Sequence, residues 1–181
     1  MNLTEIYQKI NSCDKCNLCK NRIVNYLYRG NPRAFIMLIG EAPGGDEQRG
    51  GKPFIGRCGK LLDDLLLKVG LDPERDVYIT NLVKDRPIDK DTGKDRKPFF
   101  DEITSCFPFL CEEMEVISPR LLITLGKTSG DWYSNYSEYD INRYYKDKKW
   151  LPLYHPSYLL RNRKEIEPFI NALEDVVKLI M

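Results

Sequence analysis

Four short stretches rich in apolar residues constrain the fold of this chain more than any other feature. They occupy residues 34–39, 77–80, 121–125 and 150–154, and each ends directly before Gly40, Asn81, Gly126 or His155. Short apolar runs that are bounded by turn or polar residues are typical of buried strands. We therefore expect four strands, most of them parallel.

Segments with helical spacing lie between the strands. In residues 56–69 the apolar positions are 61, 62, 65, 66 and 69, and Gly70 is a natural stop. Further helices are predicted at 3–11, 99–117, 127–136 and 165–181, although Pro108 complicates the start of the third of these five. Alternating strands and helices predict an α/β fold, and 181 residues suit one domain spanning 1–181.

Composition excludes several classes of protein. Hydrophobic residues make up 42% and charged residues 30%, which argues against a disordered chain. The first residues have neither a basic start nor an apolar core, and no apolar run is long enough to span a membrane. We expect a cytoplasmic monomer without a membrane partner.

Charge is uneven although the net charge is only +1. Residues 141–164 carry seven basic side chains and one aspartate, a local charge of +6, and aromatic residues are interleaved with them from Trp132 to Tyr158. This composition suits phosphate contacts and base stacking, but it also suits a solvated surface with a few packed tyrosines.

The loops after the strands are the expected ligand site, because ligands of parallel sheets bind at the carboxyl ends of the strands. The first loop, GEAPGGDE at 40–47, lacks the spacing of both common nucleotide-binding loops. Its glycines and carboxylates, with Phe54 soon after, suit a small-molecule pocket. His155 is the only histidine of the chain, so any imidazole chemistry must use it. A lone histidine is more often structural.

Six cysteines stand at positions 13, 16, 19, 58, 106 and 111. The spacing of Cys13, Cys16 and Cys19 is typical of a metal or iron–sulfur site, and Cys106 and Cys111 are further candidates. The alternative is a set of free buried thiols, which we favour for Cys58.

Three long motifs in order make the chain resemble the family 4 uracil-DNA glycosylases. They are GEAPGGDEQRGGKPFIG at 40–56, YITNLVK at 78–84 and HPSYLLRN at 155–162. The resemblance covers residues 13–162 and implies a three-layer αβα sandwich around a mostly parallel four-stranded sheet. It also implies a monofunctional enzyme that hydrolyses the glycosidic bond of flipped-out uracil in DNA, leaves an abasic site and releases uracil.

The resemblance also assigns roles to residues. Phe54 would stack on uracil, Asn81 would read its Watson–Crick edge, and Glu47 would close the pocket against a methyl group. Backbone groups of Glu41, Ala42 and Pro43 would line the other edge. His155 would stabilise charge on the leaving base, and Glu41 would orient water or favour the cationic sugar. The implied DNA-binding residues are Ser157, a wedge of Tyr158, Leu159 and Leu160, and the phosphate contacts Arg161 and Arg163.

One departure from the family concerns its cofactor, a 4Fe-4S cluster held by four cysteines. Cys13, Cys16 and Cys106 match three of them, but KDRP at 84–87 places Asp85 where a cysteine is expected. Asp85 could bind iron through oxygen, Cys19 or Cys111 could substitute, or the cluster could be absent. We favour a structural cluster. The loop between 85 and 106 is also longer than the family pattern.

Two alternative functions remain open. The first is excision of another deaminated base, against which Phe54 and Asn81 argue. The second is binding of uracil-containing or single-stranded DNA without cleavage, which the change at Asp85 makes conceivable.

Overall fold

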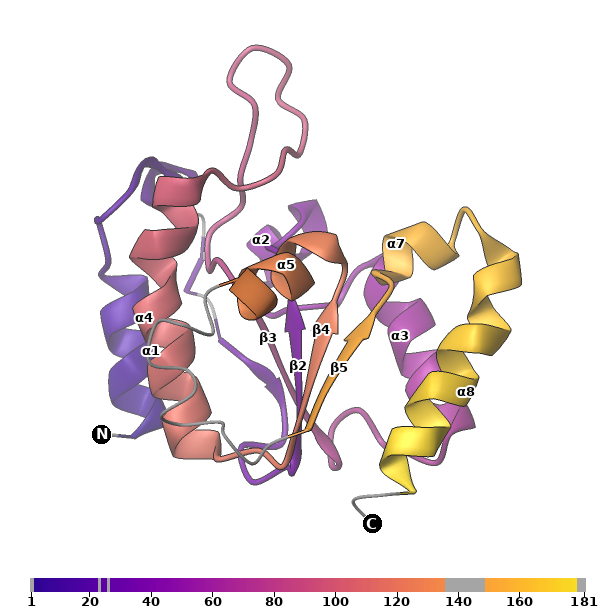
Figure 1. The fold of residues 1–181 in the computed structure, drawn as a ribbon. Coiled ribbons are helices and arrows are strands. Elements are labelled where there is room, and N and C mark those ends of the chain that lie inside the picture. Colours follow the sequence, from indigo (N-terminus) through magenta and orange to yellow (C-terminus); the bar gives the residue numbers. More distant parts are fainter. Residues whose placement is uncertain (1, 23, 26, 136–148, 179–181) are drawn as a thin grey trace.

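The computed structural model describes residues 2–22, 24–25, 27–135 and 149–178 (Figure 1). Its strands are β1 (Arg29–Gly30), β2 (Ile36–Gly40), β3 (Val77–Asn81), β4 (Leu121–Leu125) and β5 (Lys149–Leu153). Its helices are α1 (Leu3–Asn11), η1 (Asn17–Asn21), α2 (Gly45–Gly50), α3 (Arg57–Lys68), α4 (Phe100–Ile117), α5 (Lys127–Asn135), α7 (Pro156–Leu159), η3 (Arg163–Glu165) and α8 (Ile166–Val177). Each predicted strand and helix is present, but residues 136 and 179–181 of the predicted helices 127–136 and 165–181 lie outside the described residues. Much of the predicted basic and aromatic stretch, residues 136–148, lies outside the described residues.

The strands form one sheet in the order β1-β3-β2-β4-β5. Strands β3, β2, β4 and β5 are parallel, while β1 pairs antiparallel with β3. The prediction of four strands was wrong, because it missed this fifth strand at the edge of the sheet. Two residues, Arg29 and Gly30, cannot show an alternating pattern, so β1 has no signal in the sequence.

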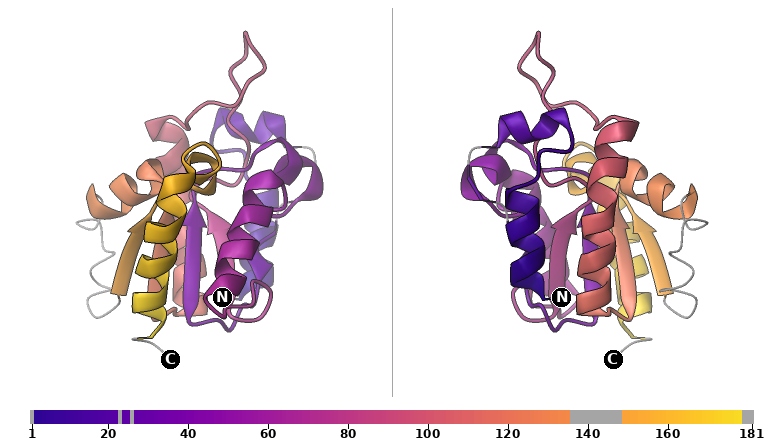
Figure 2. Two further views of the ribbon diagram at one scale, coloured as in Figure 1. Left: turned by 90° about the vertical axis from the view of Figure 1, so that its right-hand side faces the viewer. Right: turned by 90° about the vertical axis from the view of Figure 1, so that its left-hand side faces the viewer.

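Alternate residues of the central strands face two separate apolar layers. Ile36, Leu38, Val77 and Ile79 pack in one cluster with leucines of α3 and residues of α8. Met37, Ile39 and Tyr78 pack in another with α4. Figure 2 shows α3 and α8 on one face of the sheet and α1 and α4 on the other. These layers agree with the predicted α/β sandwich and explain why the strands are apolar throughout.

Proline does not interrupt α4. The helix runs unbroken from Phe100 to Ile117 with Pro108 inside it. Its start is held by Glu102, whose carboxylate accepts from the backbone N–H of Phe99 at 2.7 Å. This contact belongs to a capping box at the start of the helix, and α4 begins at Phe100, one residue after the predicted start at 99.

The carboxyl ends of the parallel strands meet at one edge of the sheet. In Figure 1 the α2, α5 and α7 segments and a long loop that follows β3 all lie at this upper edge. The motifs singled out in the sequence follow β2, β3, β4 and β5 and are therefore gathered there. Within the described residues, no helix is both long and apolar enough to cross a membrane.

Candidate active site

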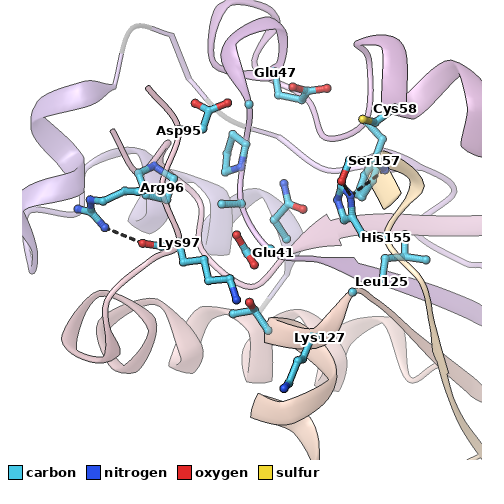
Figure 3. A pocket seen from close by; sticks show the side chains of 18 residues that line it. Glu41, Glu47, Cys58, Asp95, Arg96, Lys97, Leu125, Lys127, His155 and Ser157 are labelled. Atoms are coloured by element: carbon cyan, nitrogen blue, oxygen red, sulfur yellow. Dashed lines mark hydrogen bonds between the residues drawn. The ribbon is translucent and has the colours of Figure 1, made fainter. Parts of the chain in front are cut away.

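A cavity of about 360 Å³ opens at this edge of the sheet. Its volume lies in the range of pockets for small ligands. The predicted residues that line it are Glu41, Ala42, Pro43, Glu47, Phe54, Asn81, His155 and Ser157. Figure 3 shows His155 and Ser157 on one side, Arg96 and Lys97 on the other, and Glu41 between them. The structure thus brings together all the residues predicted to act on the base.

The segment that carries Phe54 is fixed by a carboxylate. Phe54 adopts a positive φ of 53°, which is unusual for a residue with a side chain. The carboxylate of Glu47 accepts from the backbone N–H groups of Ile55 at 3.1 Å and Gly56 at 2.9 Å. A Cβ on Gly59 would lie 1.7 Å from the carbonyl oxygen of Phe54. These contacts hold the Phe54 ring against the cavity, 5.7 Å from the His155 ring between centroids.

Asn81 is the last residue of β3 and is almost fully buried. A Cβ on Gly40 would lie 2.2 Å from Oδ1 of Asn81 and 2.7 Å from the Phe54 ring. Glycine at this position therefore lets the amide and the ring pack over the end of β2. The amide presents both a donor and an acceptor to a planar ligand in the cavity.

His155 immediately precedes α7, and its ring is held by Ser157. The backbone N–H of Ser157 donates to Nδ1 at 3.1 Å, and Oγ of Ser157 lies 2.8 Å from the same atom. Because Nδ1 accepts, the proton of the neutral ring is on Nε2. Burial lowers the pKa of His155 to about 4. The residue is therefore an uncharged hydrogen-bond donor at neutral pH.

A buried ion pair lies behind Asn81. Nζ of Lys84 donates to the carbonyl oxygen of Asn81 at 2.7 Å and to the carboxylate of Glu113 at 2.5 Å. Lys84 is 2% exposed and Glu113 is 0% exposed. The hydroxyls of Tyr7, Tyr78 and Thr80 also donate to Glu113. This network, which the sequence analysis missed, ties the end of β3 to α1 and α4.

The segment after His155 corrects one of the DNA-binding predictions. Leu159 is 0% exposed and packs in the core with α3 and α8. It cannot act as a wedge without leaving the core, so the prediction for this residue is wrong. The helical turn of α7 points every third or fourth side chain inward, which explains the error. Leu160 is half-buried, and Arg161 and Arg163 are exposed.

Tyr158 is half-buried and contacts the ring of Tyr154, with centroids 4.7 Å apart. Ser157 holds the His155 ring through its hydrogen bonds to Nδ1. Of the three residues predicted to form a wedge, Tyr158 and Leu160 are therefore the ones that keep accessible surface.

Four cysteines surround a second, much smaller cavity beside η1 and α4. They are Cys13, Cys16, Cys19 and Cys106. Cys111 does not line this cavity and packs instead against the apolar cluster on the α4 side of the sheet. None of the six cysteines is in a disulfide. Within the described ranges, no three Cys, His, Asp or Glu side chains are already arranged to hold a single metal ion.

Asp85 also lines the small cavity, but its carboxylate is occupied. Oδ1 accepts from Nε of Arg22 at 2.8 Å, and Oδ2 accepts from Nη2 of the same residue at 2.5 Å. A bidentate pair of this kind is among the stronger polar contacts in proteins. Four thiols remain as donors, and thiolates are the ligands of iron–sulfur clusters. The chemistry of this donor set fits such a cluster.

Several residues of the larger cavity were not predicted as site residues. Cys58, Pro87, Asp95, Arg96, Lys97, Lys127 and Thr128 all line it. Of these, Lys127 and Thr128 follow Gly126 at the end of β4; the rule for parallel sheets already pointed to Gly126 and Lys127, but no role was assigned to them. Asp95, Arg96 and Lys97 come from the loop after β3, which returns to the site about a dozen residues after leaving it, and no local pattern reveals this.

Comparisons with known proteins agree with this geometry. The model of the uracil DNA glycosylase superfamily matches residues 27–177. A type-4 uracil-DNA glycosylase of Sulfurisphaera tokodaii is 38% identical over 96% of this chain and 84% of its own length. The proteins of the same name from Thermotoga maritima and Archaeoglobus fulgidus are 35% and 36% identical, over 96% and 87% of this chain and 90% and 83% of their own lengths.

Proposed function

The chain belongs to the type-4 uracil-DNA glycosylases, and from this premise we propose that it hydrolyses the N-glycosidic bond of uracil in DNA and leaves an abasic site. The observation that carries the proposal is one cavity lined by Phe54, Asn81 and His155, which suits a planar base with alternating donors and acceptors. The base must leave the helix to reach this cavity.

Asn81 and Phe54 select the base. Phe54 stacks on the flipped uracil, while the amide of Asn81 donates to a carbonyl and accepts from N3–H. Cytosine presents the opposite pattern of donors and acceptors at those positions, so a buried amide in the orientation that reads uracil disfavours it. Glu47 holds the Phe54 segment through Ile55 and Gly56 and thereby limits room for the methyl group of thymine.

His155 stabilises the leaving group. Cleavage of the bond leaves an electron pair on uracil, and water supplies the hydroxyl that joins the sugar. The Nε2–H group of the neutral His155 ring donates to the uracil oxygen on which negative charge develops. Such a donor acts without a proton transfer and costs no reorganisation when it is held in place beforehand. Ser157 provides that orientation.

Glu41 acts on the sugar side. Its carboxylate lies in the cavity, where it orients the attacking water or stabilises the positive charge that develops on the deoxyribose.

The DNA-binding residues are Ser157, Tyr158, Leu160, Arg161 and Arg163, of which Tyr158 and Leu160 fill the space left by the flipped base. The enzyme works as a cytoplasmic monomer of one domain.

Cys13, Cys16, Cys19 and Cys106 would hold a 4Fe-4S cluster at the small cavity. Cys19 takes the place of the expected third cysteine because Arg22 occupies both oxygens of Asp85. When bound, the cluster supplies structural cross-links between the N-terminal segment and α4. It takes no part in the hydrolysis.

Excision from a labelled oligonucleotide tests the proposed activity. The substrate carries one uracil, the matched control carries thymine at the same position, and alkali follows the incubation. We expect cleavage at uracil only after alkali, and strong loss of product for His155→Ala with DNA binding retained. An alkali-sensitive site at thymine, or full activity of His155→Ala, would refute the assigned roles.

Iron content tests the cysteine assignment separately from activity. Iron and visible absorption are measured after anaerobic purification of Cys19→Ser, Asp85→Asn and the control Cys111→Ser. We expect Cys19→Ser to lose iron, and the other two variants to retain it. Iron loss in Asp85→Asn but not in Cys19→Ser would assign the fourth ligand to Asp85.

A further inference from the structure

A hairpin that follows β3 forms a wall of the active site opposite α7. Residues 86–97 leave the sheet edge, pair through a bridge between Ile88 and Asp95, and return to the cavity. The backbone N–H of Arg96 donates to the carbonyl oxygen of Pro87 at 3.1 Å and closes the base of the hairpin. In Figure 1 the loop projects well beyond the upper edge of the sheet.

Arg96 anchors the returning arm of this 86–97 hairpin. Its guanidinium donates twice to the carboxylate of Glu102, at 2.8 and 2.6 Å, and Glu102 is 3% exposed. The same group lies over the Phe99 ring and donates to the carbonyl oxygen of Lys97 at 2.9 Å. The backbone of Lys97 is therefore fixed, while its side chain extends into the cavity mouth (Figure 3).

Lys127 lines the same cavity from another element. It is the first residue of α5, after Gly126, whose φ of 96° and hydrogen bond to the carbonyl oxygen of Leu153 set the turn. Lys97 and Lys127 are both exposed and both line the cavity. The carboxylate of Asp95, which also lines it, is paired with Arg86 at 2.5 Å.

We infer that Lys97 and Lys127 form a second phosphate-binding surface, which holds the DNA backbone next to the flipped nucleotide on the side opposite α7. This inference rests on the proposed function for the identity of the ligand. When the base enters the cavity, its sugar and phosphates remain at the mouth, near the exposed lysines that line it. Arg161 and Arg163, which are exposed, follow α7 on the His155 side of the cavity, so the damaged strand is held between two basic surfaces.

Salt dependence of binding tests the inference. A duplex with a non-hydrolysable fluorinated deoxyuridine is titrated with protein over a series of potassium chloride concentrations. The slope of log K against log salt is negative, and each lost phosphate contact should reduce its magnitude by about 0.9. The double variant Lys97→Gln/Lys127→Gln should therefore reduce the magnitude by about 1.8. The control is Lys68→Gln, because Lys68 ends α3 about 15 Å along the helix from the cavity residue Cys58.

We expect the control to keep the wild-type slope, and all variants to keep the wild-type unfolding midpoint. A double variant with the wild-type slope would overturn the inference, even if the protein excises uracil. A shallower slope would support it even if no uracil were released, so this test and the excision assay fail independently.

Discussion

The pKa of His155 provides the sharpest test of the proposed chemistry. Burial lowers it from 6.5 to about 4, an effect that the nearby Glu47 opposes only in part. The unfolded chain therefore takes up a proton on this ring between pH 6.5 and pH 4, while the folded protein does not. Folding stability from this group is fully present above pH 6.5 and is lost as the pH falls toward 4. One pKa unit corresponds to about 1.4 kcal/mol, which gives a loss of about 3 kcal/mol over that window.

Nuclear magnetic resonance measures the pKa directly. His155 is the only histidine, so an untagged protein gives one ring Cε1–H signal that needs no assignment by mutation. The signal should shift with a midpoint near pH 4. In parallel, urea unfolding of the wild type and of His155→Gln is compared between pH 7 and pH 4. The difference between the two proteins isolates the histidine, because all carboxylates are common to both.

The proposed role of His155 also fixes the activity profile. A neutral Nε2–H donor keeps its protonation state from pH 8 down to about pH 5, so the rate of bond cleavage at saturating DNA should not titrate near pH 6.5. A ring signal with a midpoint at or above pH 6.5, or the same loss of stability in His155→Gln as in the wild type, would refute the reasoning.

Three further substitutions test the surroundings of the pocket. Glu113→Gln leaves Lys84 buried without its charge partner and should lower the free energy of unfolding in urea by about 3–5 kcal/mol. The control Glu112→Gln removes a partly exposed ion pair and should lower it by less than about 1 kcal/mol. Equal losses in the two variants would contradict this. Asn81→Asp should slow uracil excision, because a carboxylate cannot donate, and should raise the ratio of cytosine to uracil product, which an unchanged ratio would refute. Leu160→Ala should slow excision from duplex DNA more than from single strands, since the unstacking cost of a few kcal/mol arises only in the duplex; equal slowing would exclude a wedge.

The local pattern of apolar residues was enough to locate most of the strands and helices. The apolar runs that became β2, β3 and β4 are buried on both faces, and this double burial is what makes a strand visible in a sequence. The rule that ligands bind at the carboxyl ends of parallel strands then located Glu41, Asn81 and His155 without any contact information. The resemblance to a family added the expected role of each residue.

Contacts between distant segments decided what the sequence left open. The three cysteines expected to hold a cluster, with Cys19, lie around one cavity only because η1 packs near α4. Whether Asp85 is available as a ligand depends on Arg22, which is 63 residues away in the chain. Likewise, only the packing of α7 shows that Leu159 belongs to the core and Leu160 does not.

The sequence by itself thus determined the strands, the alternation of helices and the loops that carry the chemistry, because these depend on the periodicity of neighbouring residues. The tertiary structure decided the order of the strands, the edge strand β1, the buried pair behind Asn81 and the return of Lys97 to the cavity. These features depend on side chains that meet across tens of residues. These features are stabilised by burial and by charge pairs between distant residues, which a short stretch of sequence does not show.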